Sequence, residues 1–372
     1  MLEEENSSRT FGKEISNTYN NKYNINTNSL IKSEKDLLNQ SKKSLSNYSF
    51  INSNYSINLK CSDKKQLLFF FSNRTNTQNK NNIFTFKLTN DETRNSHNLT
   101  QDELKEYLNE IIINMLTDEK VNSLDYSSNF FKKQDLNNIN EKHRGVLIDW
   151  LSHSSANWEP NDETFFLSIN IIDRYISKKK ISLEKFQLLG IASYFIASKF
   201  EYMNLQILDE LVSSCKKLYT ANNIIEMEYD ILTTLNFDIC FISSYKFLFY
   251  FYIFGEFNNI KLFYLSQLIL EICCLNIEIM NFSQSKRAIC SLLIAKKCLQ
   301  IKTGNENNIL NLCKMDEFEI KEIQKKIVLF LNFIIKRDKQ SLILEKFTRY
   351  KYMKVTDVFI RKNVKSQSWL CY

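Results

Sequence analysis

Apolar residues recur at steps of three and four over most of the chain from Leu99 onward, a spacing that places them on one face of a helix. The first stripe is Leu104, Tyr107, Leu108, Ile111, Ile112 and Met115. Later stripes are Phe165, Ile169, Ile172 and Ile176, and then Leu188, Ile191, Ala192 and Phe195. The pattern predicts an all-α fold.

The stretch around Leu188 predicts a central helix. It is rich in small residues, namely Gly190, Ala192, Ser193, Ala197 and Ser198. Small side chains let neighbouring helices approach closely, so we expect this helix to be buried on most sides.

Four more helix-period segments follow Phe237. They read SSYKFLFYFY, KLFYLSQLILEICCLNIEIM, SKRAICSLLIAKKCL and EFEIKEIQKKIVLFLNFI. The chain is therefore expected to contain two successive groups of helices. Residues 1–98 are rich in Asn, Ser and Lys without sustained periodicity, which predicts a disordered low-complexity tail.

Composition agrees with long helices, because the chain has only 5 Gly and 1 Pro. The net charge of +7 is spread along the chain without a dense Lys/Arg block, so nucleic acid is not indicated as a partner. The chain begins MLEEENSS, which is acidic and polar, and its apolar runs are too short to cross a bilayer. We expect no secretory signal and no membrane partner.

Motifs of catalysis and metal binding are missing from the sequence. There are only 3 His, the 9 Cys form no CxxC pair, and no Gly-rich phosphate loop, HExxH, GxSxG, HRD or DFG motif occurs. The sequence favours a protein with no catalytic residues, no metal site and no cofactor.

Four blocks carry a family resemblance: HRGVLIDWL (143–151), NDETFFLSINIIDRYI (161–176), KFQLLGIASYFIASKFEY (185–202) and YTANNIIEMEYDILTTLNF (219–237). In this order and at these spacings they resemble the cyclin box of a cell-cycle cyclin of the mitotic, A/B-like branch. The resemblance implies two tandem cyclin-box repeats, at 141–240 and 241–358. A docking helix and linker (99–140) would precede them, and a C-terminal tail (359–372) would follow.

The resemblance also implies a function. Cyclins bind and activate a cyclin-dependent protein kinase, control cell-cycle progression, and work in the nucleus and cytoplasm without catalytic activity of their own. An alternative is a cyclin-fold transcription regulator or a relative of the general transcription factors. Such proteins usually carry an N-terminal zinc ribbon, whereas Cys61 stands alone in the tail. A scaffold that has lost its kinase surface is a third hypothesis.

Lys199 and Glu228 are the main candidates for kinase binding. Taken alone, they are a cation near a helix C-terminus and an exposed acid. However, they match the lysine and glutamate that cyclins place side by side to hydrogen-bond backbone groups of the kinase. Apolar surface beside them is expected from Phe200, Leu232 and Phe237. Leu104 and Tyr107 lie on the preceding helix, which either docks on the kinase or folds onto the chain's own core.

A docking patch for substrates and inhibitors with Arg-x-Leu sequences is expected at Val146, Trp150, Phe186 and Gln187. For Trp150 the alternative is a half-buried core aromatic. His143 replaces the family's usual Met, and His153 stands where an acidic residue would receive the motif's basic side chain. These departures predict docking that is altered or absent.

Arg144 and Asp173 are charged residues within two very apolar helical segments. An unpaired buried charge would cost several kcal/mol, so they either face water or satisfy each other. In cyclins the residues at these positions pair across two helices, which implies a structural ion pair.

Arg9–Asn17 (RTFGKEISN) resembles the destruction box through which ubiquitin ligase machinery recognises mitotic cyclins. Gly12 stands where the family has leucine, so a chance match is the favoured interpretation. Leu205, Gln206 and Ile242 replace prolines that are usual in the family. The subtype and the identity of the kinase therefore stay open.

Overall fold

The structure is a computed structural model that describes residues 101–121, 130–132, 134, 139–158, 162–202, 207–215, 218–337 and 341–365. Within these ranges, the side chains of residues 101–104, 120–121, 202, 337 and 361–365 are not described. All regular elements of this part are helices, which confirms the all-α prediction. The tail predicted for residues 1–98 and the Arg9–Asn17 motif lie outside the described residues. No helix of the described part is long and apolar enough to span a membrane.

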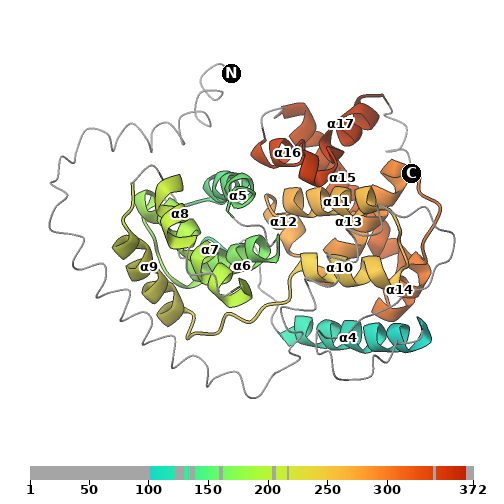
Figure 1. Cartoon of the computed structure of the whole chain (residues 1–372), viewed down its shortest axis with the longest axis horizontal. Helices are drawn as coiled ribbons and strands as arrows, with labels where there is room; N and C mark the ends of the chain where they lie inside the picture. Colours follow the sequence, from blue (N-terminus) through green and yellow to red (C-terminus); the bar gives the residue numbers. More distant parts are fainter. Residues whose placement is uncertain are drawn as a thin grey trace, which may run out of the picture. The chain divides into compact units, whose positions relative to one another are not determined.

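The chain first forms α4 (Gln101–Val121) and then a group of helices that surrounds α7. This group consists of α5 (Glu141–Ser155), α6 (Asp162–Lys178), the 3-10 helix η1 (Leu183–Lys185), α7 (Phe186–Tyr202), α8 (Ile207–Ser214) and α9 (Ala221–Thr234). Helix α7 packs against α5, α6, α8 and α9 (Figure 1). Its residues 188–198 are all buried, as predicted for a central helix.

Small residues explain why α7 can hold this position. A Cβ atom at Gly190 would lie only 2.9 Å from Cδ1 of Leu147 on α5. Helix α5 therefore approaches α7 at a distance that only a glycine permits without movement of Leu147.

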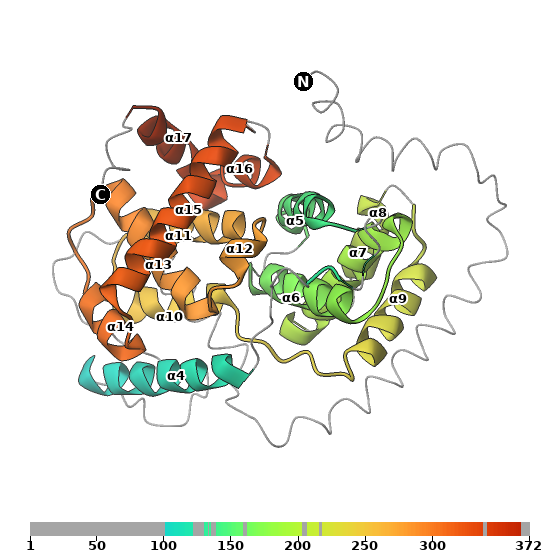
Figure 2. The ribbon, with the colours of Figure 1, turned by 180° about the vertical axis from the view of Figure 1, so that it is seen from behind.

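A second group of helices repeats the arrangement around α13. It contains α10 (Ser244–Phe254), α11 (Ile260–Cys273), α12 (Ile277–Met280), α13 (Gln284–Leu299), α14 (Glu306–Cys313) and α15 (Glu317–Arg337). Helix α13 packs against α10, α11, α14 and α15, and the two groups form separate blocks (Figure 2). The fold thus consists of two tandem helical repeats.

Three short elements end the described chain: α16 (Leu342–Lys346), the 3-10 helix η2 (Tyr350–Tyr352) and α17 (Val355–Lys365). Helix α17 runs across the boundary that the sequence analysis set between residues 358 and 359. The helical region therefore extends beyond that boundary, to Lys365.

Helix α4 lies along α10 and α14 of the second repeat (Figures 1 and 2). Its face of Leu108, Ile111, Ile112 and Met115 is buried. At its C-terminal end, the carboxylate of Glu119 accepts hydrogen bonds from the backbone N–H (2.7 Å) and the hydroxyl (2.6 Å) of Ser285. Helix α4 is therefore folded onto the chain's own core, which was one of the two alternatives.

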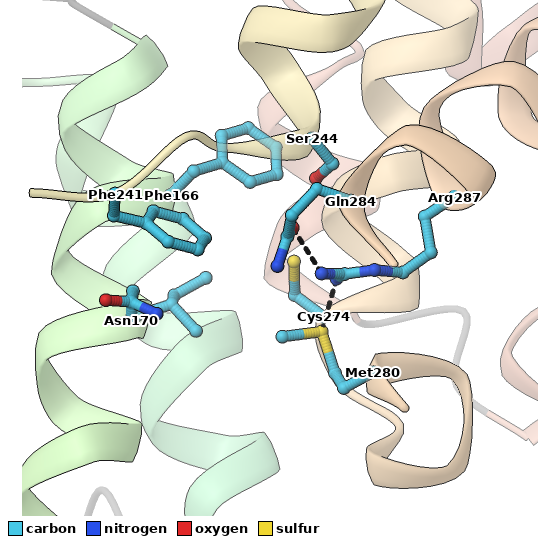
Figure 3. Close-up of a pocket in the computed structure, with 9 residues that line it drawn as sticks. Phe166, Asn170, Phe241, Ser244, Cys274, Met280, Gln284 and Arg287 are labelled. Carbon is cyan, nitrogen blue, oxygen red and sulfur yellow. Dashed lines mark hydrogen bonds between the residues drawn. The ribbon is translucent and has the colours of Figure 1, made fainter. Parts of the chain in front are cut away.

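A small cavity lies where the repeats meet. It is lined from α6 by Phe166, Ile169 and Asn170, from the connection by Phe241, and from the second repeat by Ser244, Cys274, Met280, Gln284 and Arg287 (Figure 3). Its volume of about 10 Å³ is room for roughly one water molecule.

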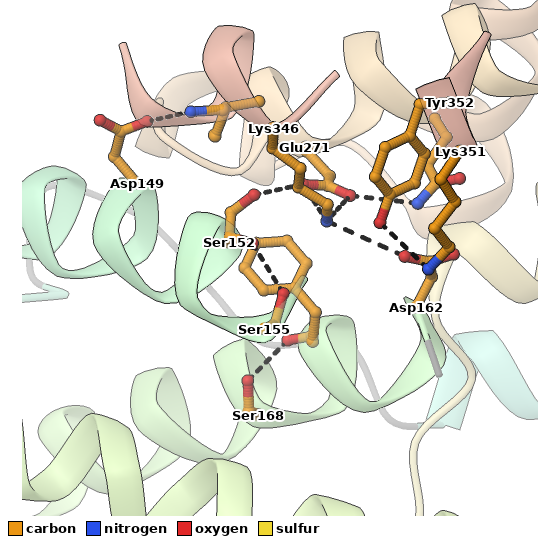
Figure 4. Close-up of polar contacts among 12 residues, drawn as sticks. Asp149, Ser152, Ser155, Asp162, Ser168, Glu271, Lys346, Lys351 and Tyr352 are labelled. Atoms are coloured by element: carbon orange, nitrogen blue, oxygen red, sulfur yellow. Dashed lines mark hydrogen bonds and ion pairs between the residues drawn. The ribbon is translucent and has the colours of Figure 1, made fainter. Parts of the chain in front are cut away.

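Buried polar groups connect α5, α11 and α16 across the same junction (Figure 4). Glu271, which is 0% exposed, accepts from Ser152 Oγ at 2.5 Å and from Lys346 Nζ at 2.7 Å. Asp149 accepts from the hydroxyl of Ser341 (2.9 Å) and from the backbone N–H groups of Leu342 (3.1 Å) and Ile343 (3.0 Å). A carboxylate of the first repeat thus satisfies the free N–H groups at the start of α16.

We expect Asp149→Ala to lower the free energy of unfolding by about 1 kcal/mol, because the first N–H groups of α16 lose their acceptor. Chemical denaturation measures the change. Glu322→Ala, which removes an exposed carboxylate on α15, is the control and should change stability by less than about 0.5 kcal/mol. Equal stability of the two variants would contradict this role of Asp149.

Candidate functional site

The structure brings Lys199 and Glu228 together. Lys199 lies in the last turn of α7, and Glu228 lies on α9, whose start is fixed by a capping box between Thr220 and Asn223. Lys199 Nζ donates to Glu228 Oε1. Because α7 and α9 pack against each other, two residues far apart in the sequence form one charged pair.

The pair is shielded on one side and open on the other. The Lys199 side chain is 18% exposed and that of Glu228 is 14% exposed. Lys199 Nζ also lies 4.2 Å from the ring centroid of Phe195, a cation–π contact. Among the described residues, neither side chain makes a further hydrogen bond. An ammonium carries three donors and a carboxylate has two acceptor oxygens, so both retain capacity for groups of another molecule.

The apolar surface differs in part from the prediction. Phe200 is 45% exposed and Phe237 is 47% exposed, as an interaction surface requires. Leu232 is only 8% exposed, so the expectation that it supplies open apolar surface is wrong: it lies on the inner face of α9. Tyr229, at 69%, is an exposed aromatic that the sequence analysis did not single out.

Phe237 has an unusual backbone conformation. Its φ of 58° and the φ of 53° at Asn236 place two successive non-glycine residues in the left-handed region. This conformation is rare for a bulky side chain and is often found at functional sites. The backbone N–H of Phe237 donates to the carbonyl of Leu232 at 2.8 Å, which fixes the turn after α9. No pattern in the sequence pointed to this conformation.

On the preceding helix α4, Tyr107 is 46% exposed and faces away from the core. Leu104 belongs to the same helix, but its side chain is outside the described part. The apolar stripe of α4 packs against the second repeat, so only the opposite face of α4 is open to another molecule.

Arg144 and Asp173 form a fully buried, bidentate ion pair. Nε and Nη2 of Arg144 donate to the two carboxylate oxygens of Asp173, each at 2.7 Å, and both side chains are 0% exposed. Nη1 donates to the backbone carbonyl of Cys274 at 2.7 Å. The pair therefore joins α5 to α6 and also connects the first repeat to the second.

The docking patch is only partly formed as expected. Val146 and Trp150 are half-buried on α5, and Trp150 packs edge to face with the buried Trp158 at 6.0 Å. Phe186 is 0% exposed, so its predicted place on the patch is wrong: it belongs to the core. Gln187 is half-buried, and its Oε1 atom has no hydrogen-bond partner among the described residues.

Two histidines flank the patch. Burial lowers the pKa of His143, which favours the neutral imidazole. Nε2 of His153 lies 3.2 Å from Nη2 of Arg349 and 3.7 Å from a carboxylate oxygen of Glu345. Arg349 also donates to Asn157 Oδ1 at 2.9 Å. This end of the patch therefore carries an arginine that the sequence analysis did not identify.

Within the described residues, no cluster of three or more His, Cys, Asp or Glu side chains could hold a metal ion. The surfaces described above consist of charged pairs and exposed aromatic rings.

Comparison with known families gives matches over both repeats. The model for "Cyclin, N-terminal domain" matches residues 110–240, and the model for "Cyclin, C-terminal domain" matches residues 242–358.

Curated relatives include cyclins of the B2 type and a mitotic cyclin. Cyclin-B2-2 of Oryza sativa subsp. indica is 32% identical over 200 residues, which cover 51% of this chain and 47% of the relative. The G2/mitotic-specific cyclin cdc13 of Schizosaccharomyces pombe is 28% identical over 227 residues, which cover 61% and 46%. The chain thus spans about half the length of the curated relatives that it matches.

Among solved structures, a viral cyclin from herpesvirus saimiri has a similar fold. The TM-score is 0.54 at 19% identity, with 59% of this chain and 96% of the viral chain covered. This likeness supports the arrangement of two tandem helical repeats.

Proposed function

Because this chain belongs to the cyclin family, we propose that it is the regulatory subunit of a cyclin-dependent protein kinase and has no catalytic activity itself. Its B-type relatives favour a role in the control of mitosis. We further propose that it works in the nucleus and cytoplasm.

The main support for a role in kinase binding is the Lys199–Glu228 pair. Its unused donors and acceptor would hydrogen-bond backbone groups of the kinase. Phe200 and Phe237 would supply the apolar contact around the charged pair. Packed on the C helix of the kinase, this surface would push that helix inward. The movement would complete the Lys–Glu ion pair that aligns ATP and would help to order the activation loop.

For substrate docking, we propose that Val146, Trp150 and Gln187 form the contact surface, without Phe186. The exposed part of Trp150 offers apolar area to a bound peptide, and the half-buried Val146 and Gln187 border it. Arg349 beside His153 disfavours the basic residue of an Arg-x-Leu sequence by like-charge repulsion.

We expect Lys199→Ala and Glu228→Ala each to weaken binding to a cyclin-dependent kinase by about 2 kcal/mol, roughly 30-fold in Kd, because each removes a hydrogen-bonding group from the centre of the interface. Titration calorimetry with the purified kinase measures the effect. Lys325→Ala and Glu322→Ala on α15 are matched controls that remove the same charges from exposed positions of the second repeat. If the site variants bind as tightly as these controls, the proposed surface is wrong.

A further inference from the structure

Arg287, on α13, borders the cavity at the junction of the repeats (Figure 3). Its side chain is 1% exposed. Its donors reach only neutral groups: Nε reaches the carbonyl of Phe282 at 3.1 Å, Nη1 reaches Sδ of Met280 at 2.6 Å, and Nη2 reaches Oε1 of Gln284. Within the described residues, no carboxylate lies within 4.0 Å of the guanidinium.

Arg287 differs from Arg144, the buried arginine of the first repeat, in having no carboxylate beside it among the described residues. Arg144 is equally buried, and Asp173 neutralises it through two hydrogen bonds. A buried guanidinium without a counter-charge destabilises the folded state, because neutral acceptors offset only part of the hydration free energy that it loses on burial. The thioether of Met280 is a weak acceptor, so one of the three contacts contributes little.

Two further polar groups border the same cavity without partners. Ser244 is 1% exposed and Asn170 is 4% exposed. Ser244 Oγ and Asn170 Oδ1 have no hydrogen-bond partner among the described residues. A hydroxyl can turn its hydrogen toward the cavity, and the amide nitrogen of Asn170 already lies on the side toward Met280 and Arg287 (Figure 3). The cavity can therefore offer donors from three side chains, one of which is cationic.

We propose that this cavity binds one small monovalent anion, with chloride as the physiological case, between Arg287, Ser244 and Asn170. An anion supplies the negative charge that Arg287 lacks and accepts from the hydroxyl and the amide. The volume of about 10 Å³ admits one small particle and excludes phosphate or a carboxylic acid. The flexible thioether of Met280 can give way where the ion needs more room than water.

The proposed anion site is formed by residues of both repeats. Asn170 belongs to α6 of the first repeat, whereas Ser244 and Arg287 belong to α10 and α13 of the second. An ion between them therefore stabilises the junction of the repeats. Lys199 and Glu228 do not border the cavity, so the site is independent of the proposed kinase surface.

Thermal unfolding of the purified chain tests the proposal, in potassium chloride and in potassium gluconate at equal ionic strength. An ion that binds only the folded state raises Tm, and we expect a Tm higher by roughly 2–4 °C in chloride. The difference should disappear in Arg287→Met. Should this variant not fold, Ser244→Ala, which keeps the arginine, must reduce the difference by at least about half.

Equal Tm values in the two salts would overturn the proposal. So would a chloride effect of unchanged size in the variants, because chloride would then act elsewhere. Lys325→Ala, which removes an exposed cation, must keep the full effect. Crystals grown in bromide should show an anomalous peak within hydrogen-bond distance of Arg287. A water molecule alone at that position would also overturn the proposal.

Discussion

Replacing Arg144 by alanine lowers the free energy of unfolding by about 3–5 kcal/mol, because it leaves the Asp173 carboxylate buried without its two hydrogen bonds. The variant also loses the bond from Nη1 to the carbonyl of Cys274, and thus one connection between the repeats. Such a loss is a large fraction of the stability of a typical domain. Chemical denaturation followed by circular dichroism measures it.

Arg174→Ala is the matched control. Arg174 pairs with Asp238 at 2.8 Å, but the Asp238 side chain is 58% exposed, and such pairs contribute at most about 1 kcal/mol. A second comparison replaces both buried partners. Arg144→Met with Asp173→Leu should cost less than either single loss of charge, because no unpaired charge remains. If Arg144→Ala destabilises no more than Arg174→Ala, the pair has no structural role.

The second large effect is expected for Lys346→Met, again about 3–5 kcal/mol. Lys346 is 1% exposed and donates to both carboxylate oxygens of Glu271, at 2.7 and 3.0 Å. Methionine keeps the length of the side chain but leaves Glu271 without its cation. The junction of α11 and α16 should lose stability while the Lys199–Glu228 surface stays intact.

The loss should depend on pH in a defined direction. Burial raises the pKa of Glu271, and Lys346 opposes this shift, so its removal raises the pKa further. Between the unfolded and the folded pKa, the folded state binds more protons than the unfolded state. Stability of the variant therefore falls as pH rises through that interval. Below the unfolded pKa, Glu271 is protonated in both states and this part of the deficit vanishes.

Denaturation of Lys346→Met across a pH series measures both effects, with Lys325→Met on the exposed face of α15 as the control. A deficit that stays constant with pH would show that lost packing, and not the unpaired Glu271, causes the destabilisation. Addition of Glu271→Gln should recover part of the stability at neutral pH, because the buried charge is removed.

The all-α fold and the central position of α7 could be predicted from the sequence, because hydrophobic periodicity and small residues act locally. The convergence of Lys199 and Glu228, and of Arg144 and Asp173, came from the family resemblance. Periodicity alone does not say which helices are neighbours.

Three features of the surfaces could not be predicted. Phe186 and Leu232 are buried beneath neighbouring helices. Whether a residue is buried in this way depends on the angles at which helices pack, and the spacing of apolar residues in the sequence does not encode those angles. The left-handed backbone at Phe237 could not be predicted, because the residue in that conformation is not a glycine.

Long-range polar contacts were also missed. Glu271 and Lys346, and likewise His153 and Arg349, meet only when the end of the chain folds back onto earlier helices. Arg287 looks like an ordinary basic residue in SKRAIC, and only its burial without a carboxylate sets it apart.

We propose above that the Lys199–Glu228 surface activates a cyclin-dependent kinase. The most direct test is histone phosphorylation by a purified kinase, with and without the full chain and with the Lys199→Ala/Glu228→Ala double variant. We expect strong stimulation by the chain and a large loss of stimulation in the double variant, whose melting temperature should stay near that of the wild type. Equal stimulation by the double variant, or none by the wild-type chain with any such kinase, would contradict this proposal.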